Sequence, residues 1–244
     1  MPLGANRINS LAKPAEVAAD SFASILFDGT GDYLQVDEDS ARTWDQFGKN
    51  GETGTIEAWV YVDDNTTRNQ LIIHRTAGTA AQGWGLEARA NEGNGTIIWF
   101  AAGRSNNPFA TGVISSATWH HVACDFNGRT VTIYVDGSSV DSNTISAEAI
   151  NSSGDLRIGD GEFVIAASQL DGNMQDIRIS TTRRYTTSFT PPTPGSLSSD
   201  TATMLLITGR NMADGDTDFT DESDTGHTVT ANGNAQADTD NLAS

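Results

Sequence analysis

The chain has 244 residues, a net charge of −18 and a sequence pI of about 4.3. This charge argues against a nucleic-acid-binding protein, because counterion release needs clustered Lys and Arg. No apolar run reaches the length of a membrane-spanning helix, and a single cysteine, Cys124, excludes an internal disulfide framework.

Residues 1–20 show no clear hydrophobic period, and we predict that they form an N-terminal arm. The segment lacks the continuous apolar stretch of a signal peptide. We therefore expect the protein to be made and kept in the cytoplasm, or to be released by a route other than ordinary secretion.

Short strand patterns recur from residue 21 onward, with turn signals between them. SILFDGTGDYLQV holds two apolar pieces around a Gly-Thr-Gly turn, and GTIEAWVYV alternates, with Ile56, Ala58, Val60 and Val62 on one face. Further candidates are QLIIHR, WGLEARA, GTIIWFAA, DLRIG and MQDIRIS. No segment carries a helical stripe, so the pattern predicts an all-β fold, a two-sheet antiparallel jelly-roll sandwich.

The stretch WHHVACDFNGRTVTIYVDG predicts a β-hairpin. The Asn-Gly pair at 127–128 is typical of a two-residue type I′ turn, which would place Phe126 opposite Arg129. The adjacent His120 and His121 would then point to opposite faces of the sheet. They cannot bind one metal ion together, and we interpret them as ordinary strand positions.

Three prolines in FTPPTPGSLSSD forbid a central strand, and we place a linker at residues 193–199. Residues 200–244 carry further strand patterns, TMLLI and HTVTANGNAQ, that are too short for a domain of their own. We expect them to return to the same sandwich, so that residues 21–244 form one domain.

Several of these segments together resemble the laminin-G-like, concanavalin A-like lectin/glucanase superfamily. The matching pieces are LFDGTGDYLQV, GTIEAWVYV, WHHVACDFNGRTVTIYVDG, LRIGD and LDGNMQDIRIS, which cover most of residues 22–182. The resemblance implies a jelly roll of two curved antiparallel sheets, in which Trp59 and Trp119 are core residues and not sugar platforms.

The C-terminal segment departs from the family pattern. TMLLITG…HTVTANGNAQ resembles the piece that usually opens such a domain, yet it stands at the end of the chain. It either completes its own sandwich, which we prefer because the linker is long enough, or is donated to a neighbouring subunit.

Candidate binding residues follow from chemistry and from the resemblance. An exposed aromatic ring beside polar groups is suited to binding a sugar. Trp44 and Phe109 lie in polar, loop-like stretches and are the candidates for carbohydrate binding. The alternative is that each aromatic side chain anchors its loop on the sandwich. In pentraxin-like relatives, acids after the LRIG strand bind calcium, which implies a calcium site at Asp160 and Glu162. Its expected partner loop at 79–82 lacks acids. No cofactor is expected to be required, and calcium is the one candidate.

Catalytic motifs are missing from the sequence. Glycosidases related to the superfamily carry Glu-x-Asp-x-x-Glu on one strand, but the single Glu-x-Asp here, at Glu222 and Asp224, is followed by His227 in place of the second Glu. The run 214–224 matches an EF-hand loop only in part, and we interpret it as a solvated acidic loop. We predict that the protein is not an enzyme.

Three function classes remain. We favour a non-catalytic structural protein on the surface of a bacteriophage virion, as capsid decoration or tail-associated protein, which would aid attachment to the host surface. The alternatives are a stand-alone glycan-binding adhesin and a glycoside hydrolase. The expected partners are other virion proteins, a host-surface glycan and further copies of the chain in a homo-oligomer, without nucleic acid or membrane insertion.

Overall fold

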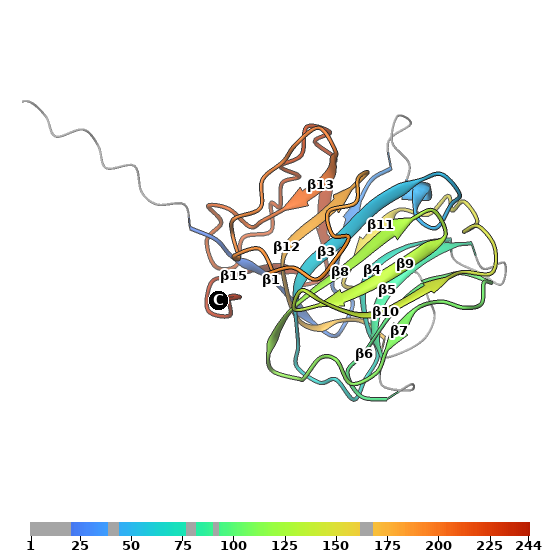
Figure 1. The fold of residues 1–244 in the computed structure, drawn as a ribbon. Helices are drawn as coiled ribbons and strands as arrows, with labels where there is room; N and C mark the ends of the chain where they lie inside the picture. The colour runs from blue at the N-terminus through green and yellow to red at the C-terminus, as the bar shows by residue number, and fades with distance from the viewer. Residues whose placement is uncertain (1–20, 39–43, 77–81, 90–92, 162–167) are drawn as a thin grey trace, which may run out of the picture.

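The computed structural model describes residues 21–38, 44–76, 82–89, 93–161 and 168–244. Within these ranges the chain forms two antiparallel sheets and one short 3-10 turn, η1 (Trp44–Gln46), and it has no α-helix (Figure 1). The predicted all-β, two-sheet sandwich is therefore confirmed. The same residues include no helix long and apolar enough to cross a bilayer, and the predicted arm at 1–20 lies outside them.

The two sheets contain strands from both halves of the chain. The first sheet follows the order β10 (Ser138–Thr144), β9 (Thr130–Val135), β8 (Trp119–Asn127), β3 (Thr53–Val62), β12 (Asp171–Ser180), β1 (Ser24–Asp28) and β15 (Gln236–Asp238), with β13 (Thr203–Ile207) also paired to β12. The second follows the order β14 (Val229–Asn232), β2 (Tyr33–Val36), β11 (Leu156–Ile158), β4 (Asn69–Arg75), β5 (Gly83–Arg89), β6 (Thr96–Ala101) and β7 (Phe109–Ala110).

The core lies between the sheets and is built from alternate residues of each strand. In β3, the four residues that the sequence places on one face are at most 2% exposed: Ile56, Ala58, Val60 and Val62. The period of two in the sequence predicts this face because successive side chains of a strand point to opposite sides. Fully burying one such aliphatic side chain stabilises the fold by about 1.5–3 kcal/mol.

The turn between β8 and β9 differs from the prediction by one residue. Asn127 pairs with Thr130, so the two loop residues are Gly128 and Arg129. Gly128 has a φ of 63°, and glycine at the first loop position is what a type II′ turn requires. Both strands keep their parity, so the faces of the hairpin are as predicted although the turn type is wrong.

The C-terminal segment contributes strands to both sheets of its own chain. β13 pairs with β12, β15 pairs with β1, and β14 pairs with β2. Figure 1 shows β13 beside β12 and β15 beside the blue β1. Leu205, Phe219 and Ala237 from this segment lie in the core, so the segment supplies packing as well as strand pairing.

Candidate functional site

Phe109 lies on the edge strand β7, and it is one of two large hydrophobic side chains that are exposed among the described residues, at 49%. Its backbone N–H donates to Asp141 Oδ2 at 2.9 Å, and Asn143 Nδ2 donates to the same oxygen at 3.0 Å. Asp141 and Asn143 belong to β10, the edge strand of the other sheet. We call Phe109, Asp141 and Asn143 the β7–β10 rim.

The β7–β10 rim combines an apolar ring with planar polar groups. Asn143 is exposed and Asp141 is half-buried, and the hydrogen bond between them fixes their relative position. A rigid aromatic ring can pack against the C–H face of a sugar, while carboxylate and amide groups bind its hydroxyls. The exposure expected of Phe109 is observed, and sugar binding by it stays a prediction.

Trp44 does not fit the role of a sugar platform. It opens η1 and is 0% exposed, and its ring centroid lies 4.8 Å from that of His227. The Trp44 carbonyl accepts a hydrogen bond of 2.7 Å from Trp84 Nε1. The prediction of a sugar-stacking Trp44 is wrong because a buried ring presents no face to a ligand; the alternative of a loop anchored by its aromatic residue describes it.

The acids proposed for calcium are only partly described. Asp160 follows β11, and its carboxylate accepts hydrogen bonds from Gly161 N at 2.7 Å and from Gln169 Nε2 at 3.4 Å. Burial raises the pKa of Asp160, and these hydrogen bonds counteract the rise in part. Glu162 lies outside the described residues.

Gln82, the one described residue of the implied partner loop at 79–82, is next to the residue that pairs with the far end of β4 from Asp160. The residue after Asp160 donates its backbone N–H to Gln70 Oε1 at 2.7 Å, whereas Gly83, next to Gln82, pairs with Arg75. Five residues of strand separate the two positions on β4, roughly 17 Å at 3.3 Å per residue. Asp160 and Gln82 therefore do not form the pentraxin-like arrangement.

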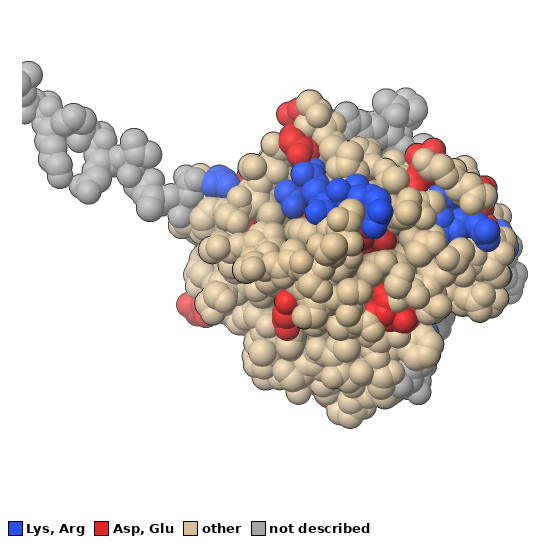
Figure 2. Space-filling model, viewed as in Figure 1, with Lys and Arg blue, Asp and Glu red and all other residues tan. Residues whose placement is uncertain are grey.

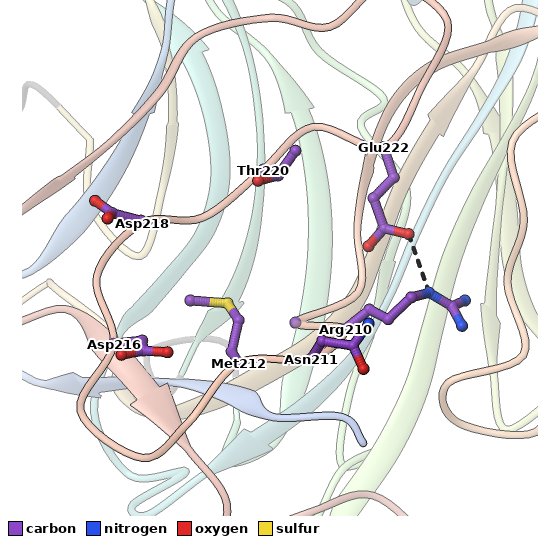
Figure 3. A pocket seen from close by; sticks show the side chains of 8 residues that line it. Arg210, Asn211, Met212, Asp216, Asp218, Thr220 and Glu222 are labelled. Atoms are coloured by element: carbon purple, nitrogen blue, oxygen red, sulfur yellow. Dashed lines mark hydrogen bonds and ion pairs between the residues drawn. The ribbon is translucent and has the colours of Figure 1, made fainter. Parts of the chain in front are cut away.

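A polar cavity of about 250 Å³ lies in the loop between β13 and β14. It is lined by Gly209, Arg210, Asn211, Met212, Asp216, Asp218, Thr220 and Glu222. Figure 3 shows Asp216 and Asp218 on one side and the Arg210–Glu222 pair on the other, with Arg210 Nε 3.3 Å from Glu222 Oε2. The sequence did not predict this cavity, because the acidic run reads as a solvated loop.

Glu222 in this cavity is held by its neighbours. Besides Arg210, the hydroxyl of Thr208 donates to its carboxylate, and Asp224 does not line the cavity. Phe219 is 5% exposed and joins the core, which anchors the acidic run on the sandwich. The cavity presents hydrogen-bonding groups to solvent, among them the carboxylates of Asp216, Asp218 and Glu222.

The family model described as the concanavalin A-like lectin/glucanases superfamily matches residues 28–187. The chain belongs to this superfamily. The match covers the strands from the end of β1 to the end of β12, and the β7–β10 rim lies within it, whereas the polar cavity lies beyond it. A search of the curated proteins finds no match for the chain.

Several solved structures align with the chain at low sequence identity. A candidate carbohydrate-binding protein from Bacteroides ovatus ATCC 8483 aligns with a TM-score of 0.62 and 17% identity, over 92% of this chain and 62% of that one. Domains LG4-5 of the mouse laminin α1 chain align with a TM-score of 0.46 and 13% identity, over 68% of this chain and 46% of that one. Domain 4 of AbnA, an arabinanase from Geobacillus stearothermophilus solved with arabinotriose, aligns with a TM-score of 0.47 and 15% identity, over 66% of this chain and 71% of that one.

This superfamily member carries a buried polar network on the outer side of its first sheet. Glu57 of β3 is 0% exposed; Arg178 donates two hydrogen bonds to its Oε1, and the Tyr185 hydroxyl donates to Oε2 at 2.6 Å. The ring of Tyr185 stacks on that of Phe189 with the centroids 3.5 Å apart. The segment after β12 therefore covers Glu57, which lies on the face of β3 opposite to Ile56 and Ala58.

Electrostatics keeps this network charged. Burial alone would raise the pKa of Glu57, but the hydrogen bond with His121 and the charge of Arg178 outweigh it and lower the pKa. Burial and the charge of Glu57 raise the pKa of Tyr185, so its hydroxyl remains a donor. His121 Nε2 lies 3.2 Å from Glu57 Oε2, while His120 contacts Asp136 at 2.8 Å, so the two histidines have separate partners, as predicted.

Figure 2 shows Lys and Arg side chains gathered on the viewed face of the first sheet. The arginines that follow β12 are paired with acids there: Arg183 Nε lies 2.5 Å from Asp125 Oδ1, and Arg184 Nη1 lies 2.7 Å from Asp200 Oδ2. These ion pairs fix the covering segment on the sheet and leave little positive charge for an external anion.

Proposed function

We propose that the chain is a non-catalytic carbohydrate-binding protein that holds a glycan at the β7–β10 rim. The observation that carries this proposal is the exposed ring of Phe109, fixed through its own backbone against Asp141 and next to Asn143. The superfamily match and the likeness to the Bacteroides carbohydrate-binding protein support the substrate class.

The β7–β10 rim is suited to a ligand that binds weakly and remains exposed to solvent. Both edge strands present side chains to solvent, so that a sugar bound there would keep much of its hydration. Stacking on one ring and a few hydrogen bonds give modest affinity, which multivalent display would increase.

The strand glutamates favour a non-catalytic protein. Glu57 and Glu87 are both 0% exposed, and each is paired with arginine, Arg178 for the first and Arg68 for the second. A glycosidase needs two carboxyl groups that reach the substrate, and these side chains are engaged inside the protein.

A glycan array on the full chain tests this function. We expect at least one class of glycan to bind, with the same hits in calcium and in a calcium chelator. An array without hits under both conditions would contradict carbohydrate binding. Release of reducing sugars from β-glucans that is lost in Glu222→Gln would contradict the non-catalytic assignment.

Display on a bacteriophage virion, as capsid decoration or a tail-associated protein, stays a prediction from the sequence and would supply the multivalence that the rim needs. Homo-oligomerisation and contacts with other virion proteins belong to the same prediction. Detection of the chain in purified particles would support it; a protein that stays monomeric at high concentration and whose gene neighbours encode no particle component would contradict it.

A further inference from the structure

Three side chains that can ligate metals meet at one end of the sandwich, inside the fold. Glu38 follows β2, Asp45 belongs to η1, and His74 belongs to β4. One ligand atom from each lies within 4.8 Å of the other two, the only such group among the described residues. We call Glu38, Asp45 and His74 the interior triad; it is separate from the β7–β10 rim and from the polar cavity.

The interior triad contains buried polar atoms without partners. His74 is 0% and Asp45 8% exposed; His74 Nε2 lies 3.3 Å from Asp45 Oδ1, which also accepts the Ser152 N–H at 2.7 Å. His74 Nδ1 and Glu38 Oε1 are buried without a hydrogen-bond partner. Buried polar atoms are rarely left unsatisfied in native proteins, because each costs free energy.

The charge of the interior triad also calls for a cation. Two carboxylates, those of Glu38 and Asp45, stand beside the one imidazole of His74. A divalent ion would neutralise the charge of both carboxylates, and the unsatisfied atoms would become its ligands. Glu38 is half-buried and the Asp45 side chain is 9% exposed, so an ion can reach the triad from solvent.

Among the described residues, none of the other three histidines belongs to such a group of three possible ligands. His120 contacts Asp136, His121 contacts Glu57 and His227 contacts Asp221, at 2.8–3.2 Å. His121 and His227 also have a buried ring nitrogen without a partner, so an unpaired nitrogen alone does not distinguish His74. What distinguishes His74 is that two carboxylates, of Asp45 and Glu38, lie within 4.8 Å of it.

We propose that Glu38, Asp45 and His74 bind one divalent transition-metal ion of the zinc class, which ties η1 and the end of β2 to β4. Imidazole with carboxylate suits zinc, whereas calcium takes oxygen ligands only. Zinc binds such atoms at about 2.0–2.2 Å, so the three side chains close inward by roughly an ångström on binding. The site differs in residues and in metal from the calcium site expected at Asp160 and Glu162.

Calorimetric titration of the chelator-stripped full chain tests the proposal. We expect one Zn²⁺ per chain with micromolar affinity or tighter, no comparable heat with Ca²⁺, and a thermal midpoint that rises with free Zn²⁺ because only the folded chain holds the site. Absence of Zn²⁺ binding, or binding of Ca²⁺ in its place, would overturn the proposal.

Matched variants locate the site. Glu38→Gln should weaken Zn²⁺ binding at least tenfold while the fold is kept, since Glu38 is only half-buried, and His74→Gln should abolish it. His120→Gln, which removes a histidine from a similar pair with Asp136 on the other sheet, should bind Zn²⁺ like the unmodified chain. Equal Zn²⁺ affinity in Glu38→Gln and the unmodified chain, at matched circular dichroism spectra, would place the metal elsewhere and reject the interior triad.

Discussion

At the scale of single residues, Asp176 is held in an unfavourable setting. It sits where β12 bulges, with a φ of 52° and 1% exposure. Its Oδ2 accepts the Gly195 N–H at 2.6 Å, while Oδ1 is buried without a partner. Burial, aided by the charges of Glu222 and Glu57, raises its pKa to about 7. The proton is therefore bound more tightly in the folded chain than in the unfolded one.

Asp176→Asn should stabilise the chain at pH 8. A raised folded pKa means that the stability of the unmodified chain falls as pH rises from about 4 to 7. Asparagine has nearly the same side-chain shape as aspartate, tolerates positive φ and cannot ionise. The free energy of unfolding of Asp176→Asn should therefore exceed that of the unmodified chain by about 1–3 kcal/mol at pH 8.

Urea unfolding at pH 4, 6 and 8 measures this difference. The gap between Asp176→Asn and the unmodified chain should close near pH 4, and Asp218→Asn, at an exposed acid, should behave like the unmodified chain at every pH. A gap of constant size across the pH range would show that ionisation of Asp176 does not cause it.

At the scale of elements, the Glu57 network joins strands that the sequence does not connect. Glu57 of β3 contacts His121 of β8 and Arg178 of β12, and Tyr185 closes the network from the covering segment. The alternation in GTIEAWVYV predicts which side of the sheet Glu57 takes. It does not predict burial on that side, because the cover comes from residues about 130 positions later in the chain.

Glu57→Gln should destabilise the chain by about 3–5 kcal/mol, because it leaves the Arg178 charge buried without its partner. The pKa of Glu57 is lowered in the folded chain, so its contribution is complete above about pH 4.5 and is lost as pH falls through the folded value. Thermal unfolding should be measured from pH 3 to 8. The difference in stability between Glu57→Gln and the unmodified chain should become smaller at acid pH. Glu52→Gln, at an exposed glutamate, serves as the control. Equal stabilities of Glu57→Gln and Glu52→Gln at pH 7 would refute the role of the network.

Local sequence accounts for strands better than for turns and site residues. Strand faces follow from period two, so the inward residues of β3 are predicted correctly. The Asn-Gly pair at 127–128 competes with the following Gly-Arg pair, and the structure uses the second. Trp44 looks exposed by its polar neighbours, but η1 turns its ring into the core. The interior triad joins residues from three elements, which no single spacing in the sequence reveals.

At the scale of the whole molecule, the last strands complete the sandwich. β13 continues the pairing of β12 beyond the point where β1 ends, and β14 forms an edge of the second sheet. The resemblance of this segment to the opening piece of the family predicted its return to the sandwich from the C-terminus. The domain limits of 21–244, with a linker at 193–199, stay our prediction.

A chain that ends at residue 199 should not fold. Each of β12, β1 and β2 would lose one of its pairing strands, and the apolar surface that Leu205, Phe219 and Ala237 cover would be exposed. Near-ultraviolet circular dichroism and light scattering should report lost tertiary structure or aggregation, whereas the full chain should give a folded species. A shortened chain with the full thermal midpoint would contradict this arrangement.

Titration of the full chain with its best glycan from the array tests the central claim most directly. Phe109→Ala should lower the affinity at least tenfold without changing the thermal midpoint, because the ring is half-exposed and its removal opens no cavity. Leu242→Ala, at the other exposed hydrophobic side chain, should bind like the unmodified chain. Unchanged affinity in Phe109→Ala would contradict carbohydrate recognition at the β7–β10 rim.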